Sequence, residues 1–197
     1  MREMLARPPA DPRAHRRPGV LVDRDGVLNE DLSFVGTRAR LRPIAGAGEA
    51  IARLHRAGFA VAVITNQSGV ARGYFDEAAV VATNVTLGEL LGRVGDPPDA
   101  FYFCPHHPEG AVAAYRTVCA CRKPGTGLVE RAIGDLDLDR VRTVLVGHAA
   151  SDIECGRAAG IATIAVGGGA AGLRADHVAA SLAEAVDWIV ARVGAAG

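Results

Sequence analysis

Residues 20–27 of this 197-residue chain read Val20-Leu21-Val22-Asp23-Arg24-Asp25-Gly26-Val27. The apolar run predicts a buried strand, and two carboxylates follow it at the carboxyl end, where open α/β sheets place their reactive groups. Asp23 and Asp25 are two residues apart, so an extended backbone points both side chains to one face, and Gly26 permits a sharp turn beyond them. One carboxylate can attack phosphorus while the other handles protons, which suits transfer through an aspartyl phosphate. Calcium loops and plain acidic turns share the pattern.

Three later segments supply further groups that phosphoryl transfer needs. Residues 60–64 predict a strand that runs into Thr65-Asn66-Gln67-Ser68-Gly69, a turn with a hydroxyl and backbone N–H groups for phosphate oxygens. Lys123 is the only lysine of the chain, and its compact ammonium suits a point charge on a phosphate. Residues 143–147 predict another strand, followed by a loop in which Asp152 lies near a helix start. A hydroxyl-rich turn, a chance lysine and a helix cap are the structural alternatives.

These motifs together resemble those of the haloacid dehalogenase (HAD) superfamily of phosphotransferases, over nearly the whole chain after the first eighteen residues. The resemblance implies that Asp23 is the nucleophile and Asp25 the general acid/base. It implies that the phosphoryl group and the substrate are bound by Asn29, Thr65, Asn66, Gln67, Arg122 and Lys123. It also implies a magnesium ion held by Asp23, the Asp25 backbone carbonyl and the last motif.

A second group of residues has the composition of a metal site: Cys104, His106, Cys119 and Cys121. Three thiolates and one imidazole suit tetrahedral zinc, and a closed set of four donors is structural rather than catalytic. Such an ion would fold the loop at about residues 104–121, which has little apolar content of its own. Disulfides or free buried thiols are the alternatives, although a Cys-x-Cys pair is too close to bridge comfortably. Cys155 is predicted to be a small apolar residue on a helix.

With this loop, the motifs resemble the heptose-bisphosphate and histidinol-phosphate phosphatase branch, whose members are compact enzymes with a minimal cap. The long interval between His106 and Cys119 is more similar to the heptose-bisphosphate phosphatases. This resemblance implies hydrolysis of a sugar bisphosphate at its C7 phosphate, with histidinol phosphate or another small sugar phosphate as the alternative. It also implies that Arg122 contacts the substrate, and a guanidinium is a suitable anchor for a second phosphate or for sugar hydroxyls.

One residue departs from that branch, because His148 stands after Val146-Gly147 where an aspartate is usual. Magnesium prefers oxygen donors, whereas imidazole is better matched to zinc, manganese, iron or nickel. Three interpretations stay open. Magnesium can be bound with Asp152 as a substitute ligand, His148 can bind a different ion such as manganese, or the protein can be a metal-impaired binder of sugar phosphates.

Length and composition agree with one domain of a cytoplasmic protein. A chain of 197 residues can bury a full core, and its formal charge of zero gives no general attraction to nucleic acid or membrane. The apolar runs are too short to span a bilayer. Residues 1–18 are rich in arginine and proline without an apolar signal core, so we expect a flexible tail followed by a single HAD-like domain at 19–197. We expect a monomer that acts on a phosphorylated sugar.

Alternating strand and helix patterns predict an α/β fold, a Rossmann-like doubly wound parallel sheet covered on both faces. Helices are expected at residues 47–57, from Asp76 to about Gly92, and at 182–193, with Trp188 on the apolar side of the last. Residues 162–166 are expected to form the final strand.

Overall fold

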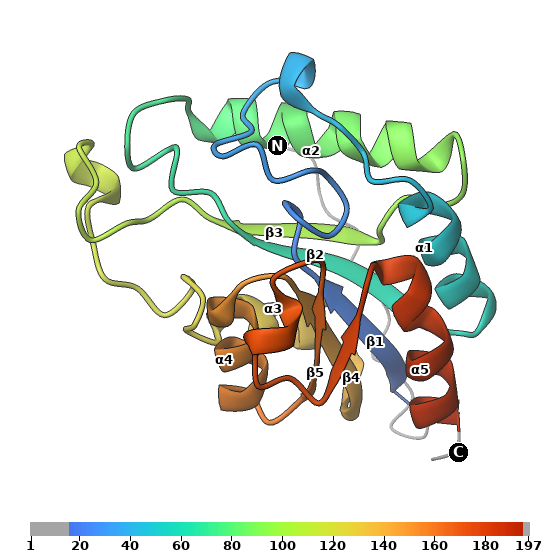
Figure 1. Cartoon of the computed structure of the whole chain (residues 1–197). Coiled ribbons are helices and arrows are strands. Elements are labelled where there is room, and N and C mark those ends of the chain that lie inside the picture. The colour runs from blue at the N-terminus through green and yellow to red at the C-terminus, as the bar shows by residue number, and fades with distance from the viewer. Residues whose placement is uncertain (1–15, 195–197) are drawn as a thin grey trace, which may run out of the picture.

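Six parallel strands form the centre of the structure, a computed structural model that describes residues 16–194 (Figure 1). The strands are β1 (Arg17–Val22), β2 (Ala60–Asn66), β3 (Ala100–Cys104), β4 (Leu138–Gly147), β5 (Ala162–Val166) and β6 (His177–Ala179). Their order in the sheet is β3-β2-β1-β4-β5-β6. The predicted parallel α/β sheet is therefore confirmed.

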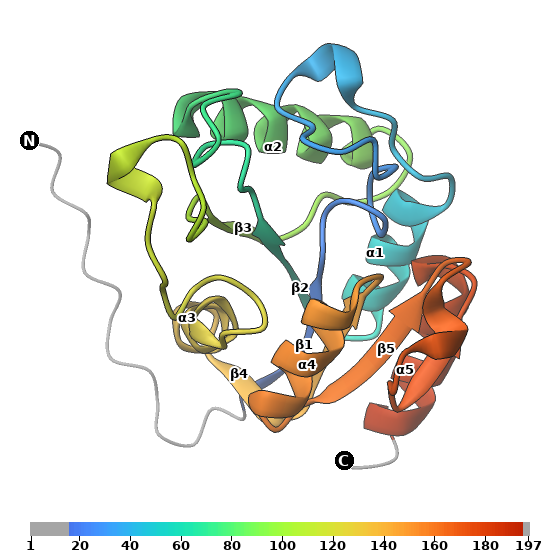
Figure 2. The same ribbon diagram turned by 60° about the vertical axis from the view of Figure 1, so that its left-hand side comes forward.

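Helices cover both faces of this sheet, as a doubly wound fold requires (Figure 2). The helices are α1 (Ala47–Arg56), α2 (Glu77–Gly92), α3 (Gly127–Asp135), α4 (Ala150–Ala158) and α5 (Leu182–Gly194). Short 3₁₀ turns lie at η1 (Arg38–Arg40), η2 (Ala113–Tyr115) and η3 (Ala170–Gly172). Helices α1, α2 and α5 contribute to the core on one face, and α3 and α4 contribute to the core on the other.

Strand β1 shows why an unbroken apolar run is needed at the centre of the sheet. Val20 and Val22 belong to the core beneath α1 and α5, whereas Leu21 belongs to the core beneath α3 and α4. Successive side chains of a strand point to opposite faces, so a strand covered on both sides must be apolar at every position. The strand delivers Asp23 to the edge of the sheet, where its backbone N–H donates to the Val146 carbonyl at 2.9 Å.

The expected helices are found with small differences at their ends. Asp76 caps α2 as expected, since its side chain accepts from the Ala79 N–H at 2.8 Å. The expectation that residues 162–166 form the last strand was wrong, because β6 pairs with β5 beyond them. Strand β6 has only three residues, too few for a readable alternation. His177 lies in β6 and stacks on Trp188 with ring centroids 4.9 Å apart.

The carboxyl ends of β1 and β4 mark the point where the strand order reverses. β2 and β3 follow on one side of β1, while β4 to β6 follow on the other, and such a switch point is where open α/β sheets bind ligands. Residues 23–46, which include η1, and 105–126, which include η2, extend from this edge of the sheet. Strand β1 begins at Arg17, and residues 1–15 of the expected tail lie outside the described residues. Across residues 16–194, the helices are too short or too polar to cross a membrane.

Candidate active site

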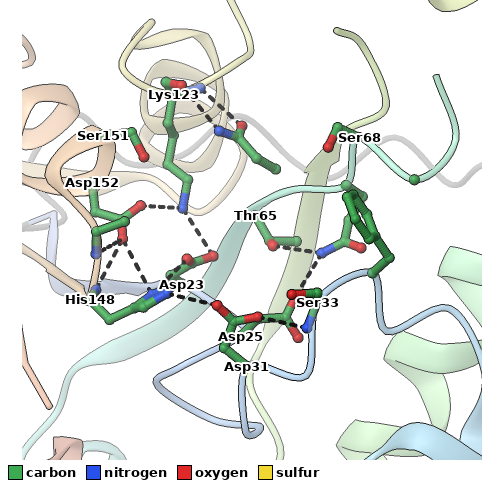
Figure 3. A pocket seen from close by; sticks show the side chains of 15 residues that line it. Asp23, Asp25, Asp31, Ser33, Thr65, Ser68, Lys123, His148, Ser151 and Asp152 are labelled. Carbon is green, nitrogen blue, oxygen red and sulfur yellow. Dashed lines mark hydrogen bonds and ion pairs between the residues drawn. The ribbon is translucent and has the colours of Figure 1, made fainter. Parts of the chain in front are cut away.

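A cavity of about 250 Å³ opens at the carboxyl ends of β1, β2 and β4 (Figure 3). Its lining brings together groups from all the predicted motifs: Asp23, Asp25, Asp31, Ser33, Phe34, Thr65, Asn66, Gln67, Ser68, Gly69, Lys123, His148, Ala149, Ser151 and Asp152. Two of the predicted substrate-binding residues, Asn29 and Arg122, do not line this cavity.

Lys123 joins the two ends of the site through its buried ammonium. Its Nζ lies 3.0 Å from Asp23 Oδ1 and 2.6 Å from Asp152 Oδ1, and it donates to the Ile64 carbonyl at 2.9 Å. Burial alone would lower the pKa of Lys123, but the charges of Asp23 and Asp152 outweigh it and the pKa is raised. The ammonium therefore stays charged beside the expected nucleophile.

Asp23 is held in its ionised form by its surroundings. Burial opposes this by raising its pKa, but Lys123, His148 and the backbone N–H of Arg24 together lower the pKa to about 2. That N–H donates to Asp23 Oδ1 at 2.8 Å. An ionised, oriented carboxylate is the form that can attack phosphorus.

Asp25 is fixed by a fully buried arginine that the sequence interpretation left without a role. Arg24 Nε and Nη2 lie 3.3 and 2.9 Å from the two oxygens of Asp25. The same guanidinium donates to Asn84 Oδ1 in α2, to the Val35 carbonyl and to Gln67 Oε1. Arg24 therefore connects the Asp25 carboxylate to α2, to the loop after β1 that contains Val35, and to the turn after β2 that contains Gln67.

The turn after β2 completes this network. Gln67 Nε2 donates to Asp25 Oδ2 at 3.1 Å and to the Thr65 hydroxyl oxygen at 2.9 Å. Asn66 does not bind a charged group; its side-chain amide makes two hydrogen bonds to the backbone of Lys123, at 3.0 and 3.1 Å. The amide thus positions Lys123, while the Thr65 hydroxyl proton stays free to donate into the cavity.

Asn29 and Arg122 support the site from outside the cavity. Asn29 is buried, donates to Asp25 Oδ1 at 3.3 Å and accepts from the Arg42 N–H at 2.6 Å. Arg122 donates to the His106 carbonyl at 3.3 Å and directly precedes Lys123 in the chain. Asn29 therefore positions a carboxylate, and Arg122 joins the Lys123 loop to the loop that carries the cysteines.

His148, the residue that departs from the branch, lies among three carboxylates. Its Nδ1 is 3.5 Å from Asp23 Oδ2 and 3.8 Å from Asp152 Oδ2, and its Nε2 is 3.4 Å from Asp31 Oδ2. The Asp23 carboxylate raises the pKa of His148 to about 9, against the effect of burial and with smaller contributions from Asp152 and Asp31. No sequence signal indicated Asp31, which the chain brings back from the loop after β1.

Asp23, His148 and Asp152 form one of the two groups of possible metal ligands among the described residues, with donor atoms within 4.8 Å of one another. Asp152 Oδ2 also accepts from the N–H groups of His148 and Ala149, both at 3.0 Å. Two carboxylates and an imidazole can hold a divalent cation. Magnesium prefers six oxygen donors, so the nitrogen makes this set a poorer match for magnesium than for a transition metal.

The second group lies at the end of β3 and consists of the predicted zinc ligands. The Sγ atoms of Cys104, Cys119 and Cys121 are 3.1–3.6 Å apart, and His106 Nδ1 is 3.4 and 3.7 Å from two of them. The thiols are free, which excludes the disulfide alternative, since a disulfide needs sulfur atoms about 2.05 Å apart. Four soft donors converging on one point fit a tetrahedral ion.

An aromatic rim that the sequence did not predict lies beside the cavity. Phe34 lines it, packs edge-on against Tyr74 with centroids 4.9 Å apart, and lies 5.6 Å from the guanidinium carbon of Arg72. Ser33 and Phe34 both have positive φ angles, 54° and 52°, a conformation that side chains rarely adopt. The strained pair lies in the loop after β1 at a point where this loop lines the same cavity as Asp23.

Comparisons with known proteins agree with this geometry. A HAD-hydrolase-like family model matches residues 120–195. A D-glycero-beta-D-manno-heptose-1,7-bisphosphate 7-phosphatase from Rhodopseudomonas palustris is 46% identical over 75% of this chain and 82% of its own length. A D-glycero-D-manno-heptose-1,7-bisphosphate 7-phosphatase from Thermosynechococcus vestitus is 40% identical over 88% of this chain and 95% of its own length.

A solved structure shares both the fold and the sequence. The D,D-heptose 1,7-bisphosphate phosphatase from B. bronchiseptica, described as a complex with magnesium and phosphate, superposes with a TM-score of 0.77 at 33% identity. The match covers 89% of this chain and 99% of the B. bronchiseptica chain. Relatives that are 40–46% identical over most of their length therefore show that this chain belongs to the heptose-bisphosphate phosphatase family of HAD-type hydrolases.

Proposed function

We propose that this phosphoric monoester hydrolase removes the C7 phosphate of D-glycero-D-manno-heptose 1,7-bisphosphate. The observation that carries the proposal is Asp23, ionised and paired with buried Lys123 at the base of a polar cavity. The names of the Rhodopseudomonas palustris and Thermosynechococcus vestitus relatives supply the substrate.

In the first step, an Asp23 oxygen attacks the phosphorus of the C7 phosphate, and the bond from phosphorus to the sugar oxygen breaks. Asp25 gives a proton to the departing oxygen, which leaves as the C7 hydroxyl. Lys123 Nζ and the Thr65 hydroxyl are placed to donate to the phosphoryl oxygens as their charge redistributes. Pre-positioned donors of this kind lower the barrier without reorganising during the reaction.

In the second step, water attacks the phosphorus of the aspartyl phosphate, and Asp25 takes the proton that the water loses. The bond from Asp23 to phosphorus breaks, which regenerates the carboxylate and releases inorganic phosphate. Asp25 must therefore keep one orientation through both steps. The buried Arg24 supplies that orientation, supported by Asn29 and Gln67.

The loop at residues 104–121 is proposed to bind a structural zinc ion through Cys104, His106, Cys119 and Cys121. Zinc would order a segment in which the short η2 turn lies between two irregular stretches. Arg122 follows the last cysteine and contacts the His106 carbonyl, so the zinc loop would fix the direction of its guanidinium. We propose that Arg122 binds the second phosphate of the substrate, with Arg72 adding positive charge nearby.

The test measures phosphate release from the heptose bisphosphate, with histidinol phosphate as the competing substrate, for the wild-type enzyme and the Asp23→Asn variant. We expect preferred turnover of the heptose bisphosphate and a loss of at least about 10³-fold in Asp23→Asn, because the covalent route is closed. Acid-quenched wild-type protein should carry phosphate on Asp23, detected by mass spectrometry.

Asp187→Asn is the matched control, because its carboxylate is exposed on α5 and pairs with Arg53. It should keep wild-type turnover. Turnover in Asp23→Asn above a tenth of the wild-type value would refute the covalent route. A preference for histidinol phosphate would refute the assignment of the heptose bisphosphate as the substrate.

A further inference from the structure

The inner nitrogen of His148 is the most unusual polar atom of the site. Nδ1 is buried, and within residues 16–194 it makes no hydrogen bond of good geometry, only long ion-pair contacts. It nevertheless faces Asp23 Oδ2 at 3.5 Å and Asp152 Oδ2 at 3.8 Å. Buried nitrogens nearly always make a hydrogen bond, so a nitrogen that makes none and faces two carboxylates at long range indicates a position for a ligand between them.

The spacing of these atoms suits a cation. An ion about 2.1 Å from each donor separates neighbouring donors by about 3.0 Å in an octahedron and about 3.4 Å in a tetrahedron, and opposite donors by about 4.2 Å. The observed separations of 3.5 and 3.8 Å lie within this range. Both separations from Nδ1 are therefore compatible with one ion, and the donor atoms of the three residues lie within 4.8 Å of one another.

The outer nitrogen of the ring has the partner that a metal-binding histidine usually has. Nε2 faces Asp31 Oδ2 at 3.4 Å. When a cation displaces the proton of Nδ1, a carboxylate on the outer nitrogen holds the remaining proton on Nε2, so the lone pair of Nδ1 binds the metal and is made more basic. This contact is independent of the Nδ1 geometry and points to the same role.

The ring is also held in place from below. Gly26 has a φ of 74°, and a Cβ at this position would lie 2.5 Å from His148 Cγ, so the absence of a side chain makes room for the imidazole. Asp152 accepts from the backbone N–H of His148 itself, which fixes the position of the carboxylate relative to residue 148. The donor set is therefore preorganised, as a metal site requires.

We propose that this site selects a first-row transition-metal dication, such as manganese, iron or cobalt, over magnesium, through His148 Nδ1 and Asp23 Oδ2. A nitrogen donor favours these ions because magnesium binds oxygen and gives up its water reluctantly. The inference deepens the proposed function, since it concerns the metal of the same site. The B. bronchiseptica relative, described with magnesium, offers the contrast.

The experiment measures metal binding without substrate. Manganese is titrated by electron paramagnetic resonance into protein that retains its zinc, with magnesium as competitor, for wild type, His148→Asp and His148→Asn. Manganese is the weakest binder of its series, so a preference measured with it is a lower bound. We expect wild type to bind manganese at least about tenfold more tightly than magnesium. Electron spin-echo modulation should show coupling to an imidazole nitrogen.

In His148→Asp, the ratio of manganese to magnesium affinity should fall toward one, and the nitrogen coupling should be absent in both variants. His177→Asp makes the same substitution on β6, outside the lining of the cavity, and should leave the ratio and the coupling unchanged. The proposal is overturned if the ratio is equal in wild type and His148→Asp, if no nitrogen coupling appears, or if neither ion binds. Selective manganese binding with no heptose phosphatase activity would refute the proposed function alone.

Discussion

Replacing Arg24 by methionine removes the buried guanidinium that fixes Asp25, and it should damage stability and catalysis together. The side chain is fully buried and reaches five acceptors: both oxygens of Asp25, Asn84 Oδ1, the Val35 carbonyl and Gln67 Oε1. Methionine fills much of the volume but donates to none of them. The largest loss is the partner of the Asp25 carboxylate, whose side chain is only 18% exposed.

Removing one partner of a buried ion pair typically costs about 3–5 kcal/mol, because the remaining charge is left without compensation. With a urea m-value of about 2 kcal/mol/M, the midpoint of unfolding should fall by about 1.5–2.5 M. Turnover should fall by about 10²–10⁴, the usual contribution of a general acid/base, because Asp25 loses its orientation.

The assay is urea unfolding followed by circular dichroism, with phosphate release measured on the folded fraction. Arg131→Met is the control, since Arg131 is exposed on α3 beside Asp135 and its loss should cost less than about 1 kcal/mol. In the double variant Arg24→Met/Asp25→Asn, much of the lost stability should return because no unpaired charge remains. A destabilisation of Arg24→Met no larger than that of Arg131→Met would refute the reasoning.

Three further predictions follow from the site. The pKa of Asp23 is about 2 in the folded protein and 3.8 in the unfolded reference, so its charge contributes stability that is present above about pH 4 and lost as the pH falls toward 2. Asp23→Asn should flatten acid unfolding in that window, and superimposable curves would contradict the shift. Cys119→Ala should remove zinc, measured by mass spectrometry of metals, and lower the melting temperature, whereas Cys155→Ala should keep the zinc. Arg122→Met should raise KM for the bisphosphate by about tenfold, because one charge-assisted contact to the second phosphate is lost. The KM for a monophosphate that lacks the second phosphate should not change. An equal effect on both substrates would assign Arg122 a structural role.

The fold could be predicted from the sequence at the central strands, because the residues of each such strand form a continuous apolar run. Residues 20–22 and 60–64 are apolar at every position, as a strand covered on both faces requires, and they are too short and too rich in valine to favour a helix. The strand at 100–104 has a mixed burial pattern because it lies at the edge of the sheet, and β6 is too short to show alternation. Edge strands depend on neighbours that are distant in sequence, so their own residues indicate them poorly.

The site divides in the same way. Asp23, Thr65 and Lys123 could be predicted because each belongs to a local motif and parallel strands end at one edge. Arg24 could not, since a charged residue between two carboxylates suggests an exposed position, and its burial depends on Asn84, sixty positions away along the chain. Asp152 has one role that the sequence offered, at the start of a helix, and one that it did not indicate. One oxygen holds Lys123, and the other accepts from the loop N–H groups at the start of α4.

Charge explains how the site can hold a dication although position 148 has no carboxylate. Asp23 and Asp152 contribute two negative charges, and Lys123 between them cancels one. Asp31 faces the outer nitrogen of His148 and adds a third negative charge. The imidazole ring lies between this charge and the cation position. With a neutral imidazole, these groups carry two net negative charges, which a dication neutralises. The carboxylate that is absent at position 148 is thus replaced by one that acts through the imidazole, so the site exchanges an oxygen donor for a nitrogen donor while keeping its charge.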